Sequence, residues 1–189
     1  MINFSEPADV VAPQLLGCVL HHAGVSIRLT EIEAYLGTED AASHTYRGPT
    51  PRNRAMFSAG GCMYVYVSYG IHRAGNIVCA PQGVGQGCLL RAGEIVEGVE
   101  LARQRRGNSI PFARLAQGPG NLGSALGLDL IHNGASIHGP DFILTPRTQQ
   151  PHWVRGPRIG ISKNTEAPLR FWIPGDKTVS SPRSAPAHI

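Results

Sequence analysis

Glu31 and Glu33 lie one residue apart in the segment LTEIEAYLG, and their spacing suggests chemistry. Side chains alternate along a β-strand, so both carboxylates would share one face, opposite Ile32 and Ala34. Taken alone, the two glutamates are expected to be exposed, because a glutamate is seldom buried. Tyr35 continues the same face, however, and a carboxylate flanked by flat rings in an apolar cleft can act as a general base. Both interpretations are open at this point.

His44 and Tyr46 follow in EDAASHTYRG and bring an imidazole and a second ring close to the glutamates in sequence. His44 read alone is an ordinary polar surface residue. Its support as a metal ligand is poor, because the chain contains no HExxH, no HxH and no closely spaced cysteine pair. A metal-dependent hydrolase is therefore the weakest functional interpretation.

Three of the five tyrosines of the chain lie within residues 61–72, GCMYVYVSYGIH. They either fill a core or form a surface that stacks on something flat. A strand here places Tyr64 and Tyr66 on one face and valines on the other, and the valines can supply the core packing. Tyr69 precedes Gly70, so it is expected at a hairpin turn from which its ring projects.

Arg52 and Arg54 lie in TPRNRAMF, just before the tyrosine strand. A basic loop is usually only solvated, but beside several tyrosines it is typical of a nucleic-acid surface. The net charge of +4 and the pI near 9.1 also suit an anionic partner. Arg91 differs, because in the apolar segment GCLLRAGEI an arginine is either paired with a carboxylate or positioned inside a site.

The composition sets further bounds. At 189 residues the chain fits one domain with a real hydrophobic core. It contains no apolar run long enough to span a bilayer, which argues against a membrane protein. The first residues, MINFSEPADVV, do not resemble a signal peptide, and the four cysteines are widely spaced without a CxxC pair. Reduced thiols in a cytoplasmic protein are therefore expected.

The elements that must position these side chains form an α+β mixture without repeats. Helical patterns cover residues 8–17, 97–107 and, in short pieces, 111–128; residues 18–35 are expected to form a hairpin that turns at Ala23-Gly24; further strands are expected at 62–70, 75–81, 87–95, 135–146, 154–162 and 169–174. An antiparallel sheet with packed helices is the natural architecture. The glycine fingerprint of a Rossmann fold is missing.

Three blocks, EIEAYLGTEDAASHTYRGPTPRNRAMF, MYVYVSYGIHRAGNIVC and LLRAGE, resemble the alkyladenine (3-methyladenine) DNA glycosylase family in order and separation. The resemblance is strongest over about residues 15–100. It implies one domain over residues 1–189. The tail SSPRSAPAHI, from about residue 180, is rich in Pro, Ser and Ala and is expected to be frayed. The implied fold is a curved, mostly antiparallel sheet with packed helices, similar to the C-terminal domain of methionyl-tRNA formyltransferase, with a β-hairpin that inserts into DNA.

The family's activity is hydrolysis of the N-glycosidic bond of alkylated or deaminated purines in duplex DNA, by base flipping, as the first step of base excision repair. The implied substrates are 3-methyladenine, 7-methylguanine, ethenoadenine and hypoxanthine. The resemblance further implies a monomer that binds damaged double-stranded DNA and uses no cofactor, no metal and no lyase step. The scarcity of lysines, only Lys163 and Lys177, agrees with hydrolysis by water.

Carried over position by position, Glu33 matches the base that activates the attacking water, and Arg91 matches its positioning partner. The remaining matches are Tyr35, His44 and Tyr66 around the flipped base, Asn76 at the pocket mouth, where it helps to reject guanine, and Tyr69 as the intercalating side chain. Arg52 and Arg54 are expected to contact the DNA backbone. The alternative is a non-catalytic nucleic-acid-binding module on the same scaffold, in which Glu33 and Arg91 would have no purpose.

Overall fold

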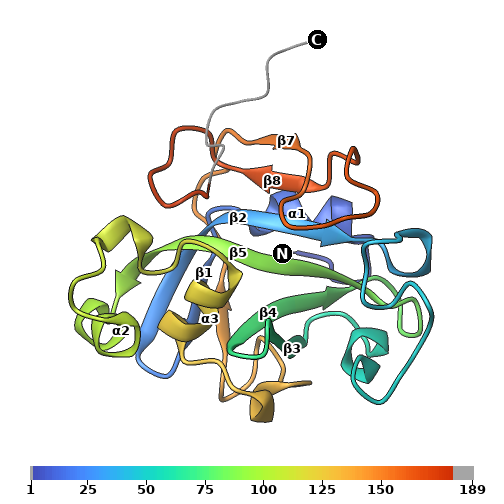
Figure 1. Cartoon of the computed structure of the whole chain (residues 1–189), viewed down its shortest axis with the longest axis horizontal. Coiled ribbons are helices and arrows are strands. Elements are labelled where there is room, and N and C mark those ends of the chain that lie inside the picture. Colours follow the sequence, from blue (N-terminus) through green and yellow to red (C-terminus); the bar gives the residue numbers. More distant parts are fainter. Residues whose placement is uncertain (1, 181–189) are drawn as a thin grey trace.

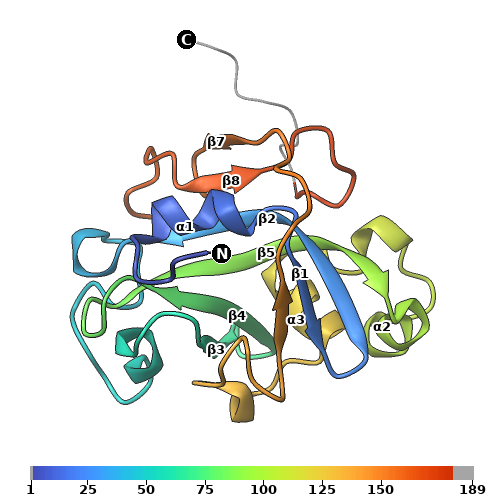
Figure 2. The same ribbon diagram turned by 180° about the vertical axis from the view of Figure 1, so that it is seen from behind.

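An antiparallel sheet forms the centre of the fold in the computed structural model, which describes residues 2–180 (Figure 1). Its strands are β1 (Val19–His22), β2 (Val25–Tyr35), β3 (Met63–Ser68), β4 (His72–Cys79), β5 (Gln86–Glu97), β6 (Ile143–Thr145), β7 (Val154–Gly156) and β8 (Arg170–Trp172). The α-helices are α1 (Ala8–Leu15), α2 (Val99–Arg106) and α3 (Pro119–Leu126). Helix α3 lies in front of the sheet in Figure 1, whereas α1 lies in front in Figure 2, the view from behind.

The long strand β2 is the point at which the sheet divides. One edge of β2 pairs with β5, and the other edge pairs first with β1 and then with β8. The neighbours continue in the order β3-β4-β5-β2-β1-β6, with β7 attached to β8. The second half of β2, which carries both glutamates, is therefore flanked by strands on each side, and its backbone is fully inside the sheet.

A β-bulge in β2 decides which face the glutamates occupy. The pairing with β5 shifts twice between Leu29 and Ile32: first β2 accommodates one residue more, Thr30, and then β5 accommodates one residue more, Arg91. Before the bulge Leu29 points into the main core, and after it Ile32 and Ala34 do so. Without the shift, Glu31 would share the face of Leu29, because strand side chains alternate strictly. The bulge turns Glu31 to the opposite face, away from the main core.

The α+β class, the early helix and the hairpin around Ala23-Gly24 are confirmed. The closing strands are shorter than predicted, because only 143–145, 154–156 and 170–172 pair with neighbours. Of the tail predicted to be frayed, Ser180 is described and hydrogen-bonded, and residues 181–189 lie outside the described part of the chain. Within residues 2–180, no helix has both the length and the apolar character that crossing a membrane requires.

Strands β3 and β4 form a hairpin in which Ser68 faces His72. At its turn Tyr69 and Gly70 both have positive φ, 49° and 74°. Gly70 adopts this conformation at no steric cost, whereas tyrosine does so rarely. The backbone thereby directs the Tyr69 side chain outward, and the residue is 86% exposed. Ile71, the next residue but one, is 76% exposed, so the tip presents two apolar side chains to solvent.

Candidate active site

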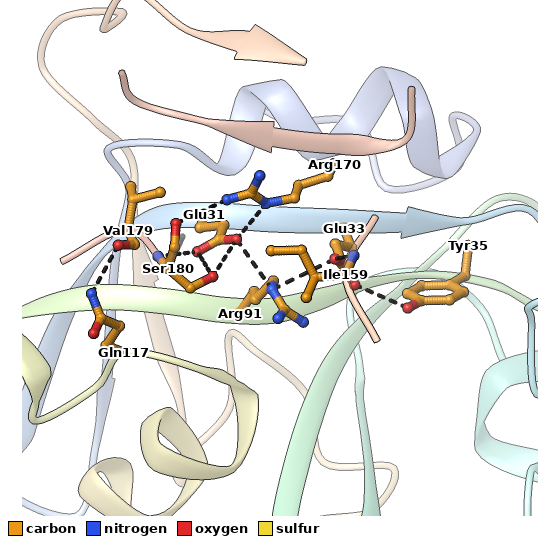
Figure 3. A network of polar contacts seen from close by, with 9 residues as sticks. All are labelled: Glu31, Glu33, Tyr35, Arg91, Gln117, Ile159, Arg170, Val179 and Ser180. Atoms are coloured by element: carbon orange, nitrogen blue, oxygen red, sulfur yellow. Dashed lines mark hydrogen bonds and ion pairs between the residues drawn. The ribbon is translucent and has the colours of Figure 1, made fainter. Parts of the chain in front are cut away.

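Glu31 and Glu33 are both completely buried, each with a relative exposure of 0%. The expectation of exposed carboxylates, drawn from the residue type alone, is therefore wrong. The reason is tertiary: strand β8 pairs along this half of β2, and residues from two further C-terminal segments, Ile159 and Ser180, hydrogen-bond the two carboxylates (Figure 3). Buried carboxylates are rare outside paired or functional settings, so their surroundings indicate what they do.

Glu33 has a hydrogen-bond donor on each carboxylate oxygen. The Tyr35 hydroxyl donates to Oε2 at 3.0 Å, and the backbone N–H of Ile159 donates to Oε1 at 2.8 Å. Arg91 Nε lies 3.5 Å from the same Oε1. Burial raises the pKa of Glu33 above its usual value, although Arg91 and the two hydrogen bonds act in the opposite direction. The result is a carboxylate that accepts a proton more readily than a solvated one.

Arg91 is paired with carboxylates, one of the two states expected for an arginine in an apolar strand. Its Nε donates to Glu31 at 3.1 Å, so the shorter contact goes to Glu31 and the longer one to Glu33. Figure 3 shows its two terminal nitrogens directed away from both glutamates. Within residues 2–180 these nitrogens make no hydrogen bond, which leaves two cationic NH₂ groups for another ligand.

A cavity of about 500 Å³ opens beside this pair of charges. The structure brings all five pocket and hairpin residues expected from the sequence into its lining: Tyr35, His44, Tyr66, Tyr69 and Asn76. Glu33 and Arg91 are not part of the lining. They lie behind it, and the hydrogen bond from Tyr35 to Glu33 connects the cavity wall to the buried carboxylate. A planar ligand in the cavity would therefore contact Tyr35 before Glu33.

The rings of the cavity form a connected wall. His44 meets Tyr66 edge to face, with ring centroids 4.5 Å apart, and Tyr66 stacks on Tyr64 at 5.4 Å. Tyr64 also shares a 3.2 Å hydrogen bond with Nδ1 of His44, which fixes the orientation of the imidazole. Tyr64 is buried and packs with Met56 and Val78. The tyrosine strand therefore does both of the things considered above: it fills a small core and lines a stacking surface.

Burial in the cavity favours the neutral forms of His44 and Tyr66. Partial burial of His44, reinforced by the nearby Arg52, lowers the pKa of the imidazole. Burial also raises the pKa of Tyr66 to about 12. Both rings are neutral at pH 7 and present π-faces, which favour a flat and especially a cationic ligand.

Asp40 organises the cavity and was not singled out by its sequence context. Its carboxylate accepts hydrogen bonds from the Arg158 guanidinium, with Nη2 at 2.8 Å, and from Asn164 at 3.0 Å. Arg158 in turn lies 4.5 Å above the Tyr35 ring and donates to the carbonyl of Ala34 at 2.9 Å. The buried pair thus ties the end of β2 to the loop of residues 158–164, which supplies part of the cavity lining.

Asp40 also fixes the segment that leads to His44. Its two oxygens accept the backbone N–H groups of Leu36 and Ala42, each at 3.2 Å. Burial alone would raise the pKa of Asp40, but the bonds from Arg158 and Asn164 outweigh it and hold the pKa below its usual value. No local pattern marks this role, because both side chains that donate to the Asp40 carboxylate, Arg158 and Asn164, come from more than 100 residues away.

The cations divide between the cavity and the rest of the surface. Arg52 lines the cavity and donates to the carbonyl of Val67 at 3.2 Å, whereas Arg54 is exposed and outside the lining. Lys163, which is also exposed, lies in the lining as well. Among the described residues, no group of three or more His, Cys, Asp or Glu side chains is placed to hold a metal ion.

Comparison with known proteins gives a consistent result over nearly the whole chain. The family model of methylpurine-DNA glycosylase matches residues 2–177. A protein of Corynebacterium glutamicum named "Putative 3-methyladenine DNA glycosylase" is 67% identical over 185 residues, which cover 98% of each chain. Proteins with the same name are 50% identical in Cutibacterium acnes, over 97% of this chain and 100% of theirs, and 44% identical in Rhodococcus jostii, over 98% and 85%.

Proposed function

Because this chain belongs to the methylpurine-DNA glycosylase family, we propose that it excises alkylated and deaminated purines from duplex DNA by flipping the damaged base into the aromatic cavity. The family membership confirms the resemblance seen in the sequence, and with it a DNA glycosylase that acts in DNA repair. The proposed substrates are 3-methyladenine, 7-methylguanine, ethenoadenine and hypoxanthine. The proposed enzyme acts as a monomer, transfers the sugar to water and has no lyase activity.

One observation carries the proposal: a buried glutamate, paired with an arginine, lies directly behind a wall of neutral aromatic rings. A base can be reached by an enzyme only after it leaves the stack, and a flat cavity with π-faces compensates for the lost stacking. A purine methylated at N3 or N7 is cationic, so the faces of Tyr35, His44 and Tyr66 attract it more strongly than a neutral purine.

The chemistry assigned to Glu33 follows from its charge and its raised pKa. Cleavage of an N-glycosidic bond passes through a sugar with oxocarbenium character, which an anion stabilises. An ionised Glu33 can also take a proton from the attacking water, with Arg91 beside it. Glu33 has no exposed surface. The proposal therefore requires that water reach the carboxylate in the DNA complex, where contacts of a free site commonly rearrange.

A single-turnover excision assay tests the function. The protein is incubated with a duplex carrying one ethenoadenine or hypoxanthine, and alkali then cleaves any abasic site. A shortened strand from the damaged duplex, but not from an undamaged one, is the expected result. Tight binding without cleavage would favour the non-catalytic binding module instead. A protein–DNA adduct trapped by borohydride would point to an amine such as Lys163 and contradict hydrolysis by water alone.

Tyr69 provides the first prediction. Its ring stands at the exposed tip of the β3–β4 hairpin beside the cavity, where it can fill the space that a flipped base leaves. Replacing Tyr69 by serine is expected to weaken binding to the lesion duplex by about 1–3 kcal/mol and to slow excision, because a stacking contact is lost. Tyr46→Ser is the control, since Tyr46 is 46% exposed but outside the cavity. Equal losses of binding and excision in both variants would show that Tyr69 at the hairpin tip has no special role.

Lys163 provides the second prediction, which concerns the salt dependence of DNA binding. Together with Arg52 it places positive charge at the cavity. We expect the phosphates next to a flipped nucleotide to pass this charge. Lys163→Gln is expected to weaken binding to damaged and undamaged duplexes alike. The slope of log K against log salt should also decrease by about one, because one phosphate contact is lost. Lys177→Gln, which removes the other, exposed lysine outside the cavity, is expected to leave the slope unchanged. Identical slopes for the two variants and wild type would contradict the assignment.

A further inference from the structure

Glu31 lies beside the proposed catalytic pair, and three other segments donate hydrogen bonds to its carboxylate (Figure 3). Its Oε1 accepts Nε of Arg91 at 3.1 Å and Nε of Arg170 at 2.6 Å. The backbone N–H of Ser180 donates to Oε2 at 2.8 Å, and the Ser180 hydroxyl lies 2.7 Å from each carboxylate oxygen. A fully buried carboxylate with this many donors is held in one orientation.

Glu31 affects Glu33 through the position of Arg91, which contacts both carboxylates. The Nε of arginine carries a single hydrogen. That hydrogen is directed to Glu31, at 3.1 Å, and Glu33 is left with an ion-pair distance of 3.5 Å. Arg170 does not compensate in the same way, because its Nε bonds to Glu31 and its Nη2 to the carbonyl of Ser180. Glu31 therefore determines how closely the Arg91 guanidinium approaches Glu33.

We propose that Glu31 is a positioning residue for Glu33: by holding Nε of Arg91, it keeps the guanidinium from closing on the Glu33 carboxylate. This inference rests on the proposed function, in which Glu33 is the base. A guanidinium that formed a two-pronged pair with Glu33 would stabilise the ionised carboxylate and make it a weaker base. The backbone N–H of Ser180 contributes by holding Glu31 from the side opposite to Arg91, as Figure 3 shows.

The charges around Glu33 support this role. The titratable groups that face it are Glu31 and Tyr35 on β2, Arg91 on β5, Tyr66 on β3 and Arg158 beside Ile159. Strand β8 contributes Arg170, which is opposite Glu33 in register but bonds to Glu31. Burial is the largest effect that raises the pKa of Glu33, Arg91 opposes it, and the negative charge of Glu31 raises the pKa further. Of the groups named here as facing Glu33, Glu31 is the one that carries a carboxylate.

The test is the pH dependence of single-turnover excision by Glu31→Gln. Glutamine keeps the shape and an acceptor oxygen but removes the anion, so the attraction that holds Arg91 away from Glu33 weakens and the Glu33 pKa is expected to decrease. The acidic limb of the rate profile should then shift to lower pH by about one unit. The ratio of the variant rate to the wild-type rate should increase as the pH is lowered, which cancels any titration of the substrate. On the alkaline plateau the loss should be within about tenfold, because a weaker base transfers protons more slowly.

Two further variants separate charge from structure. Ser180→Ala removes hydrogen bonds to Glu31 without changing any charge, so its acidic limb should coincide with that of wild type. Glu31→Gln leaves Arg170 as a buried cation without its carboxylate, which can prevent folding. The double variant Glu31→Gln/Arg170→Gln removes both charges and retains Arg91, and the limb should again shift to lower pH.

The outcomes distinguish this inference from the proposed function. If wild type excises no damaged base, the proposed function fails. If wild type is active and the limb stays in place in Glu31→Gln and in the double variant, only the role of Glu31 is overturned. A limb that shifts equally in Ser180→Ala would also overturn it, because the effect would then come from packing rather than from the charge of Glu31.

Discussion

Replacing Glu33 by glutamine is expected to leave binding to a lesion duplex close to that of wild type and to abolish almost all excision. Glutamine keeps the size and the hydrogen-bonding reach of glutamate, so Tyr35 and Ile159 retain a partner. What disappears is the charge that takes a proton from water and faces the developing positive sugar. General-base catalysis alone is worth about 10²–10⁴ in rate, and loss of the electrostatic contribution adds to that. Single-turnover excision and an equilibrium binding titration on the same duplex measure the two effects.

The effect of Glu33→Gln can be assigned to Glu33 itself, because the substitution leaves no buried cation without a carboxylate partner. Arg91 keeps its shorter bond, to Glu31, when Glu33 is neutral. Since burial raises the Glu33 pKa above its ordinary value of 4.5, ionised Glu33 costs stability at pH values above that value. The variant is therefore expected to melt at no lower temperature than wild type at pH 7. Normal excision by Glu33→Gln would refute the mechanism, and equal plateau losses in Glu31→Gln would mean that Glu31 is the base.

The second large effect is expected for Asp40→Asn, and it concerns stability and the shape of the cavity. Removing one partner of a buried, hydrogen-bonded ion pair leaves an uncompensated charge, here on Arg158, and costs about 3–5 kcal/mol. The free energy of unfolding, from denaturant titration at pH 7, measures it. Excision should decrease as well, because Asp40 holds Arg158, which connects β2 to the 158–164 loop, and both contribute to the cavity.

The pH dependence provides a check on Asp40→Asn. The pKa of Asp40 is held below its ordinary value of 3.8, so its contribution to stability is fully present above that pH. The contribution is lost as the pH falls through the lower, folded-state pKa, and the difference between wild type and variant should shrink there. Asp176→Asn is the matched control, because its partner Arg28 is more exposed and lies outside the cavity. A cost as large for Asp176→Asn as for Asp40→Asn would contradict the special role of the Asp40 pair.

The sequence by itself determined those features that depend on local pattern. Alternation in residues 62–70 predicted the strand that holds Tyr64 and Tyr66, and the Tyr69-Gly70 pair predicted the turn that exposes Tyr69. These predictions succeed because strand alternation and backbone steric preferences act between neighbours in the chain. The pocket residues were assigned from blocks long enough to show the family; they line one cavity, and their roles stay predictions.

Only the tertiary structure decided which charges meet. The burial of Glu31 and Glu33 depends on β8, on Ile159 and on Ser180, which follow them by more than 120 residues. The irregular pairing of β2 with β5 sets the face that the two glutamates occupy, and no residue type in this segment predicts that irregularity. The pairs of Glu31 with Arg170 and of Asp40 with Arg158 likewise join distant segments. Such contacts depend on how strands pair and on what is excluded from water, and neither is visible in the spacing of residues along the chain.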